Sequence, residues 1–429
     1  MKYYENIFHS LKELPILDVH SHISIDQPQC SDLSDILFYH FMRRELYSAG
    51  LPDDNFLVSD APFEKKIEEF FKYKSFIENT ATYWCIKKIF NDIYQISDGD
   101  LHPDNWKELR QQIIHKGRDF SYPKSILNRM NVKCSLICEN HWSQEGLARN
   151  PFLIPLYEDL DLFHFDPTRN LSLLDLIAKE FGGLPENSDQ AEQLIYDFFK
   201  KKSQSGVRYF TAFVSSAFHL IKPVSGQINE IYNKKKAGAQ LHAEENNILF
   251  TWLFYSYLEA LKHVGTPAQF VIGAYWARPG MRYGESYVWN NHQLSLDLVE
   301  IFKDFPSVSM SLMIASLSMA QEFTIIARML PNVSLLGFWW HTLVPNIIEQ
   351  LISQRIESLP SNKWIAIATD AYSVEWAYGK VSLVLHCLAR VLSQKVEEGY
   401  FTEKTAIEYA RRILYENPKE IYQLNWVER

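Results

Sequence analysis

Eight short apolar runs recur along the 429-residue chain, and they constrain its fold more than any other feature. Each run is nearly continuous in its apolar content. Strands that are covered on both faces, as in parallel sheets, show this pattern. The runs are LPILDVH (14–20), NVKCSLIC (131–138), LDLFHFD (160–166), VRYFTAF (207–213), QFVIGAY (269–275), SVSMSLMI (307–314), VSLLGFW (333–339) and WIAIATD (364–370).

The segments between most of these runs read as helices. SDQAEQLIYDFFKKK begins at a candidate cap, Asn187 or Ser188, and carries apolar residues at helical spacing. MAQEFTIIARML (319–330) and PNIIEQLISQRIESL (345–359) precede the last two runs, and the second of them opens with proline, which suits a first helical turn. Eight strands that alternate with helices predict an α/β fold, a (β/α)8 TIM-like barrel.

We expect residues 1–429 to form a single barrel domain. The stretch 21–130, between the first two runs, is far longer than an ordinary connection and is rich in aromatic and helical patterns. We interpret it as a helical insertion at the active-site mouth. Residues 402–429 read as closing C-terminal helices, with Thr402 as a candidate cap.

Composition excludes several classes of partner. A net charge of −9 disfavours nucleic acid, which needs a basic face. No run reaches the ~18 apolar residues of a membrane helix, and the N-terminus lacks a signal-peptide profile. The five cysteines include no CxxC pair, so neither a disulfide framework nor a thiolate zinc site is indicated. We predict a cytoplasmic protein without a membrane partner; a homo-oligomer remains open.

His20 and His22 form an HxH pair at the end of the first run. Composition alone predicts about 0.5 such pairs by chance, so the pair is a weak signal by itself. Its position is more informative, because residues two apart on a strand face the same side. Barrel enzymes place their active sites at the C-terminal ends of the strands. Neutral imidazoles at such a place suit zinc and similar divalent metals.

Asp370, which ends the eighth run, is the candidate third ligand. An unpaired charge is costly to bury, so a carboxylate after an apolar strand is not a core filler. The first and eighth strands are neighbours in a closed barrel, so His20, His22 and Asp370 can converge on one metal. The alternative is a pair of hydrogen-bonded histidines and a structural aspartate. Asp18 is either a partner of the ligands or a polar residue at the strand end.

These motifs resemble those of a known protein family. Asp-x-His-x-His on the first strand, with Asp ending the eighth, is the pattern of the amidohydrolase superfamily. Within it, the chain resembles the uronate (glucuronate) isomerases. The resemblance rests on ILDVHSH, DILFYHF (35–41), FDP (165–167), LLGFWW (335–340) and ATDAYS (368–373), and on the long insertion.

This resemblance implies a metal-dependent aldose–ketose isomerase that acts on a small sugar acid such as D-glucuronate. One divalent metal, zinc by preference, would act as a Lewis acid on the substrate carbonyl. The family roles of proton-transfer base and assisting histidine fall here on Asp370 and His40.

The chain departs from the family at positions that face the substrate carboxylate. Tyr372 stands where the family has arginine two residues after the strand-eight aspartate, and His164 stands near a second arginine position. Neither side chain offers the bidentate fork of arginine. Arg278 and Lys380 are candidates to supply the missing positive charge, or are surface cations. Trp340 is either a sugar-stacking platform or a packing residue.

Two rival functions remain open at the level of sequence. One is a metal-dependent hydrolase of a lactone, amide or ester, which is a common activity of the superfamily. The other is a non-catalytic barrel that binds a sugar acid or another partner. His219 and His341 lie after other strands at the same face; each is a candidate extra ligand or acid, although a lone histidine of this kind more often has neither role.

Overall fold

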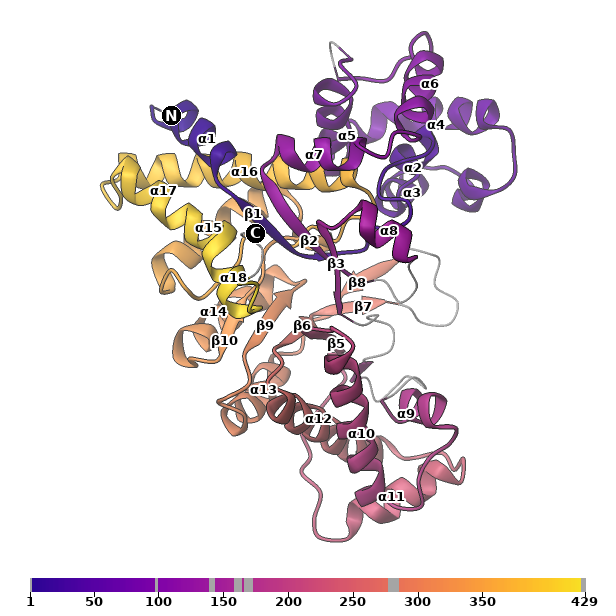
Figure 1. Cartoon of the computed structure of the whole chain (residues 1–429), viewed down its shortest axis with the longest axis vertical. Coiled ribbons are helices and arrows are strands. Elements are labelled where there is room, and N and C mark those ends of the chain that lie inside the picture. Colours follow the sequence, from indigo (N-terminus) through magenta and orange to yellow (C-terminus); the bar gives the residue numbers. More distant parts are fainter. Residues whose placement is uncertain are drawn as a thin grey trace.

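The computed structural model describes residues 2–96, 99–138, 143–157, 164–165, 173–276 and 285–425. The side chains of His40, Leu156, Tyr157, His164, Phe165, Trp276 and Trp340 lie outside this description. Parallel strands occupy the centre of the molecule, and helices surround them (Figure 1).

The parallel strands belong to two sheets. In the first sheet, β1 (Ile16–Ser21), β2 (Val132–Cys138) and β3 (Leu153–Tyr157) pair in that order. The second sheet has the order β10-β9-β6-β5-β4. Its strands are β4 (His164–Phe165), β5 (Phe210–Val214), β6 (Ala268–Ile272), β9 (Met310–Ile314) and β10 (Val333–Leu335).

Segment 364–370, the predicted eighth strand, joins these two sheets. Leu335 of β10 pairs in parallel with Trp364 at its start. At its other end, the Asp370 amide donates to the carbonyl oxygen of His20 on β1, with a nitrogen–oxygen distance of 2.8 Å. The two sheets therefore continue into one another through this segment, and the predicted (β/α)8 TIM-like barrel is confirmed.

The third strand is where the structure differs from the sequence expectation. We expected it at 160–166, and the structure describes only β4 within that run. The strand that pairs with β2 is β3, which the sequence analysis missed. Its sequence LIPLY contains Pro155, and a proline inside an apolar run argues against a central strand because it donates no ladder hydrogen bond.

The fifth predicted run also divides. β6 ends at Ile272, and Gly273 follows with a φ of +83°, a conformation that glycine adopts readily. The chain then enters β7 (Ala274–Trp276), which pairs antiparallel with β8 (Ser286–Val288). This hairpin stands at the C-terminal ends of the barrel strands, the end at which the first strand carries its histidines.

Helices lie between most of the strands, as the sequence pattern predicts. Between β1 and β2 lie α2 (Leu33–Leu37), α3 (His40–Ser48), the 3-10 helix η1 (Asp54–Val58), α4 (Phe63–Ile77), α5 (Ala81–Asp92), α6 (Trp106–Lys116) and α7 (Tyr122–Arg129). Figure 1 shows most of them, in purple, gathered at one corner of the molecule. α10 (Ser188–Gln204) has Asn187 as its cap, as predicted. α15 (Pro345–Ser358) begins with its proline in the first turn.

The remaining helices surround the barrel and close one end of it. They are α1 (Tyr4–Glu13), α8 (Gln144–Arg149), α9 (Leu173–Phe181), α11 (Gln227–Lys236), α12 (Ala243–Val264), α13 (His292–Asp304), α14 (Leu317–Met329), the 3-10 helix η3 (Trp340–Thr342), α16 (Val374–Glu397), α17 (Glu403–Arg411), the π-helix η4 (Arg412–Glu416) and α18 (Asn417–Ile421). None of the described helices is long and apolar enough to cross a bilayer.

The barrel interior is filled from the strands and from the C-terminal segment. Its apolar cluster includes Leu17, Val19, Leu136, Phe213, Val271, Met313 and Ile365 from the strands, with Tyr422 and Leu424 from the chain end. Asn417 of α18 donates from its side chain to the Trp364 carbonyl, at the start of the eighth strand. The C-terminal segment therefore covers the N-terminal end of the barrel, opposite the histidine pair.

Candidate metal centre

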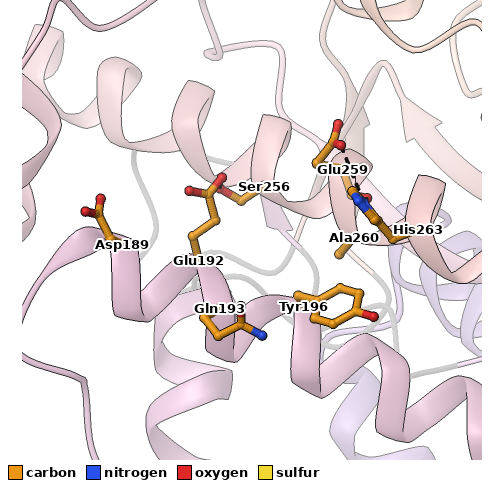
Figure 2. Close-up of a pocket in the computed structure, with 8 residues that line it drawn as sticks. All are labelled: Asp189, Glu192, Gln193, Tyr196, Ser256, Glu259, Ala260 and His263. Atoms are coloured by element: carbon orange, nitrogen blue, oxygen red, sulfur yellow. Dashed lines mark hydrogen bonds and ion pairs between the residues drawn. The ribbon is translucent and has the colours of Figure 1, made fainter.

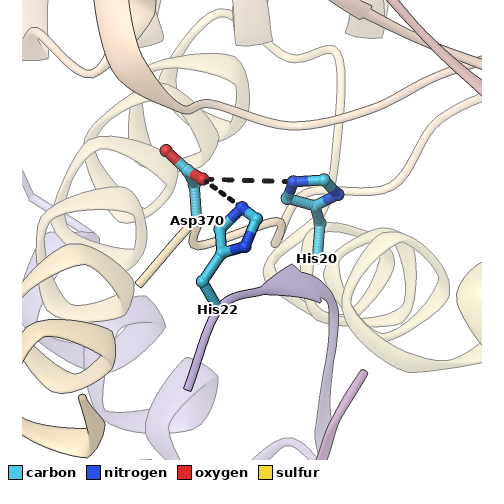
Figure 3. Close-up of side chains that lie close together, drawn as sticks. All are labelled: His20, His22 and Asp370. Carbon is cyan, nitrogen blue, oxygen red and sulfur yellow. Dashed lines mark ion pairs between the residues drawn. The ribbon is translucent and has the colours of Figure 1, made fainter. Parts of the chain in front are cut away.

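The structure brings His20, His22 and Asp370 together at the C-terminal ends of neighbouring strands (Figure 3). His20 lies on β1 and is fully buried, and His22 follows the end of β1 at Ser21. Asp370 Oδ1 lies 3.2 Å from His22 Nε2 and 4.0 Å from His20 Nε2. One candidate ligand atom from each residue lies within 4.8 Å of the others.

The protonation of His20 and of Asp370 suits a divalent cation. Burial, together with the neighbouring His22, lowers the pKa of His20 to about 4, so its imidazole is neutral at pH 7. Burial raises the pKa of Asp370, but the His22 hydrogen bond and the Lys380 charge outweigh this and leave it below its ordinary value. A neutral imidazole and an ionised carboxylate are the forms that bind metal. These residues therefore fit the predicted divalent metal.

Gln269 fixes which nitrogen of His20 faces the triad. The Gln269 amide donates to the Val19 carbonyl (3.1 Å) and to the Tyr422 hydroxyl (2.7 Å), which leaves its Oε1 as the acceptor on the other side. His20 Nδ1 lies 3.1 Å from that oxygen, and the Thr211 hydroxyl also donates to it. Nδ1 therefore carries the proton, and the lone pair of Nε2 points toward Asp370.

We expect Gln269→Leu to weaken binding of a divalent metal, with Zn²⁺ as the probe, about 10- to 100-fold, because leucine cannot accept the Nδ1 hydrogen bond that orients the His20 ring. Competition against a chromophoric chelator measures the change. Gln394→Leu is the control, because the Gln394 amide donates to Glu398 on the exposed side of α16, away from the triad. Equal zinc affinity in Gln269→Leu and the parent protein would contradict the assignment.

Asp18 is buried on β1 and ties the neighbouring strands together. Its Oδ2 accepts hydrogen bonds from the hydroxyls of Ser135 on β2 and of Thr369, both at 2.7 Å. Its Oδ1 accepts from the Thr369 amide at 2.9 Å. Burial raises the pKa of this carboxyl. Asp18 thus fixes the position of Thr369, the residue that precedes Asp370. Of the two roles that the sequence left open, this geometry favours a partner of the ligands over a polar residue at the strand end.

Tyr372 and Lys380 differ in their exposure and in the groups that they contact. The Tyr372 ring stacks on His22, with centroids 5.1 Å apart, and the residue is 43% exposed. Lys380 of α16 is 1% exposed, and its ammonium donates to the Asp370 carbonyl oxygen and to the Tyr39 hydroxyl. Tyr372 is therefore placed to meet a ligand that enters from solvent. The geometry of Lys380, predicted from sequence as a substrate-binding cation, favours a contact with the protein backbone instead.

Other predicted site residues fall wholly or partly outside the described residues. Arg278 does so entirely. His40 begins α3, Trp340 begins η3 and His164 begins β4, but nothing is described of their side chains. These four residues remain predictions.

His341 and His219, the two candidates for an extra ligand or acid, contact residues outside the triad. His341 Nε2 lies 3.2 Å from the Ser286 hydroxyl of the β7–β8 hairpin, and burial lowers its pKa to about 4. His219 Nδ1 lies 3.7 Å from a carboxylate oxygen of Asp297 on α13. The described metal triad does not include either residue.

A separate hollow lies between α10 and α12, on the outside of the barrel (Figure 2). Its lining residues are Asp189, Glu192, Gln193, Tyr196, Ser256, Glu259, Ala260 and His263. His263 Nδ1 lies 2.8 Å from the Glu259 carbonyl oxygen and 3.4 Å from its carboxylate. This hollow is remote from the strand ends, and the metal triad is not part of it.

Parallel barrel strands, an HxH pair on the first strand and an aspartate after the last define a TIM-like barrel whose strand ends carry a possible site for a divalent metal. No known protein-family profile matches the chain. Its sequence is similar to that of the uronate isomerase of Thermotoga sp. (strain RQ2). The two are 17% identical over an alignment of 446 positions, which covers 97% of this chain and 96% of the relative.

Solved structures show the same likeness. The glucuronate isomerase of Caulobacter crescentus superposes with a TM-score of 0.85 at 15% identity, covering 99% of this chain and 94% of that one. The uronate isomerase of Thermotoga maritima gives 0.83 at 16% identity, covering 98% and 97%. The resemblance that the motifs indicate is therefore confirmed over nearly the whole chain.

Proposed function

We propose that this protein is a metal-dependent aldose–ketose isomerase that acts on a hexuronate or a related sugar acid. The observation that carries the proposal is the His20–His22–Asp370 triad at the strand ends of a barrel that is similar to uronate isomerases along almost its full length. A small sugar acid is the class of substrate that these relatives' names indicate.

His20 Nε2, His22 Nε2 and one carboxylate oxygen of Asp370 would hold the metal, which we propose to be zinc. When bound, it supplies a Lewis acid that polarises the substrate carbonyl and acidifies the adjacent C–H bond. The protein's contribution is to keep these three side chains oriented, through Gln269 on His20 and through Asp18 on the segment before Asp370.

Isomerisation removes a proton from C2 of the open-chain aldose and returns one to C1, while the hydroxyl proton of C2 passes to the carbonyl oxygen. Asp370 is the group that we propose to take and return the carbon-bound proton. It lies at the open end of the strands and is ionised, as a general base must be. His40 is proposed as the second proton-transfer group, acting between the two oxygens.

We propose that Tyr372, Trp340, His164 and Arg278 bind the rest of the substrate. Tyr372 is the described member of this set, and its partly exposed ring over His22 supports a place beside the sugar chain. A phenol offers one hydrogen bond to a carboxylate, where an arginine fork offers two. We therefore expect weaker selection for the uronate carboxylate than an arginine would give.

The test is to incubate zinc-loaded protein with D-glucuronate and D-galacturonate and to follow ketose formation. We expect turnover on at least one of them, lost after chelation and restored by zinc. Protein that retains one equivalent of metal and turns over neither sugar would overturn the proposal. Metal-dependent hydrolysis of a lactone panel by the same preparation would assign the site to a hydrolase instead.

A further inference from the structure

Asp370 holds an unusual backbone conformation for a residue with a side chain. Its φ is +51°, in the left-handed region that glycine favours. Such a conformation persists where the surrounding structure enforces it. The geometry also sets the direction in which the Asp370 carboxylate leaves the chain. The contacts that enforce this backbone therefore decide whether Asp370 Oδ1 meets the two histidines.

Two buried side chains hold the Asp370 carbonyl oxygen. Lys380 Nζ donates to it at 2.8 Å, and the Tyr39 hydroxyl donates to it at 3.0 Å. Lys380 Nζ also lies 3.0 Å from the Tyr39 hydroxyl, so the three groups form a closed triangle. Tyr39 directly precedes α3, and Lys380 is in α16. The triangle therefore fastens the end of the eighth strand to α16, which follows it, and to the residue before α3, which is 331 positions away in the sequence.

The Lys380 side chain fills this space at a cost in free energy. An ammonium group is costly to bury, and the residue is 1% exposed. The Tyr39 ring lies 5.1 Å from Nζ and the Phe41 ring 5.8 Å, which compensates in part through their negative faces. Burial lowers the pKa of Lys380, in keeping with this environment. An apolar side chain would fill the same volume without the charge, but it could not hold a carbonyl oxygen.

We propose that Lys380 and Tyr39 form a carbonyl clamp, a pair of positioning residues that hold the Asp370 backbone so that its carboxylate completes the metal triad. The inference rests on the proposed metal centre, so its readout is metal binding and not sugar turnover. A parent protein that binds no metal would refute the proposed function; a parent protein that binds metal leaves the clamp to be tested by variants.

Lys363, which directly precedes the eighth strand, provides a matched control. It is 9% exposed, and its ammonium likewise donates to two backbone carbonyls, those of Leu330 (2.8 Å) and Pro331 (3.0 Å). It precedes the eighth strand, at the barrel end opposite the triad. Lys363→Met therefore removes a buried lysine and two carbonyl hydrogen bonds without touching Asp370.

The experiment compares Co²⁺ binding by Lys380→Met, Lys363→Met and Tyr39→Phe. We expect both lysine variants to lower the urea midpoint. Only Lys380→Met is expected to weaken Co²⁺ binding about 10- to 100-fold and to change the Co²⁺ d–d spectrum. Tyr39→Phe keeps the ring and the lysine and loses one donor, so we expect the same change at smaller size, which keeps the test decisive if Lys380→Met does not fold.

Two results would overturn the clamp. One is parental Co²⁺ affinity and spectrum in the folded Lys380 and Tyr39 variants. The other is an equal loss of affinity in Lys363→Met, which would attribute the effect to general destabilisation.

Discussion

Asp370→Asn is expected to lower kcat for hexuronate isomerisation by about 10³-fold or more. The amide is nearly isosteric, so the backbone contacts to His20 and Lys380 can persist. It cannot take up a proton at neutral pH, and it removes the negative charge that faces the two imidazoles 3.2 and 4.0 Å away. General-base catalysis is worth about 10²–10⁴-fold, and a weakened metal site adds to that loss. Steady-state ketose formation, with the metal content of each sample measured, checks this result.

Asp297→Asn is the matched control for that experiment. Asp297 is a largely buried carboxylate on α13 that is not part of the triad. It accepts hydrogen bonds from the Leu220 amide and from the Gln293 side chain. We expect it to change stability and leave kcat at the parental value. A metal-loaded Asp370→Asn protein with parental kcat would remove Asp370 from the chemistry and return the site to a purely structural role.

The metal triad could be predicted because its information is local. His20 and His22 are two residues apart at a strand end, which is enough to place them on one side of β1. Asp370 ends a separate apolar run, and the adjacency of the first and last strands in a barrel brings it beside them. Each step uses only strand periodicity and barrel closure. The structure places the three ligand atoms as those two rules require.

The groups that orient the triad could not be found in this way. Gln269 reads in the sequence as the polar start of an apolar run, and its partner His20 is 249 residues away. Tyr39 and Lys380 are separated by 341 residues, and their shared target is a backbone carbonyl with no sequence signature. Tertiary packing, and not a local sequence pattern, brings such partners together. The sequence predicts Lys380 to be a substrate-binding cation or a surface cation, whereas in the structure its side chain is buried and its ammonium contacts the Asp370 carbonyl oxygen.

The lengths of the strands and the breaks within them are the other features that could not be predicted from the sequence. β3 was missed because Pro155 interrupts its run, and β10 spans only Val333–Leu335 of the seven residues expected at 333–339. Apolar content marks which segments are buried, but the hydrogen-bond ladder depends on neighbouring strands. Segment 364–370 illustrates this, because it joins β10 through one isolated bridge and β1 through separate backbone hydrogen bonds, without a continuous ladder.

Asp18→Ala is expected to lower the free energy of unfolding by about 3 kcal/mol or more. The substitution leaves the Thr369 amide and the hydroxyls of Thr369 and Ser135 without their carboxylate acceptor, and each stranded buried donor costs about 1–3 kcal/mol. The hydroxyls can rotate, and Ser135 already contacts the Ser21 hydroxyl, so they recover part of this cost. The Thr369 amide cannot rotate. Urea denaturation of the parent and the variant measures the difference.

Two controls separate hydrogen bonding from charge in that prediction. Asp18→Asn retains one oxygen for the Thr369 amide while its amino group can donate to the rotated hydroxyls, and it removes a buried carboxyl whose pKa is raised by burial. We therefore expect a smaller loss than for alanine. Asp26→Ala deletes an exposed carboxylate that accepts from the Ser143 amide, and we expect a change below about 1 kcal/mol. If Asp18→Ala cost no more than Asp26→Ala, the strands at the metal site would have to be held by their apolar packing alone.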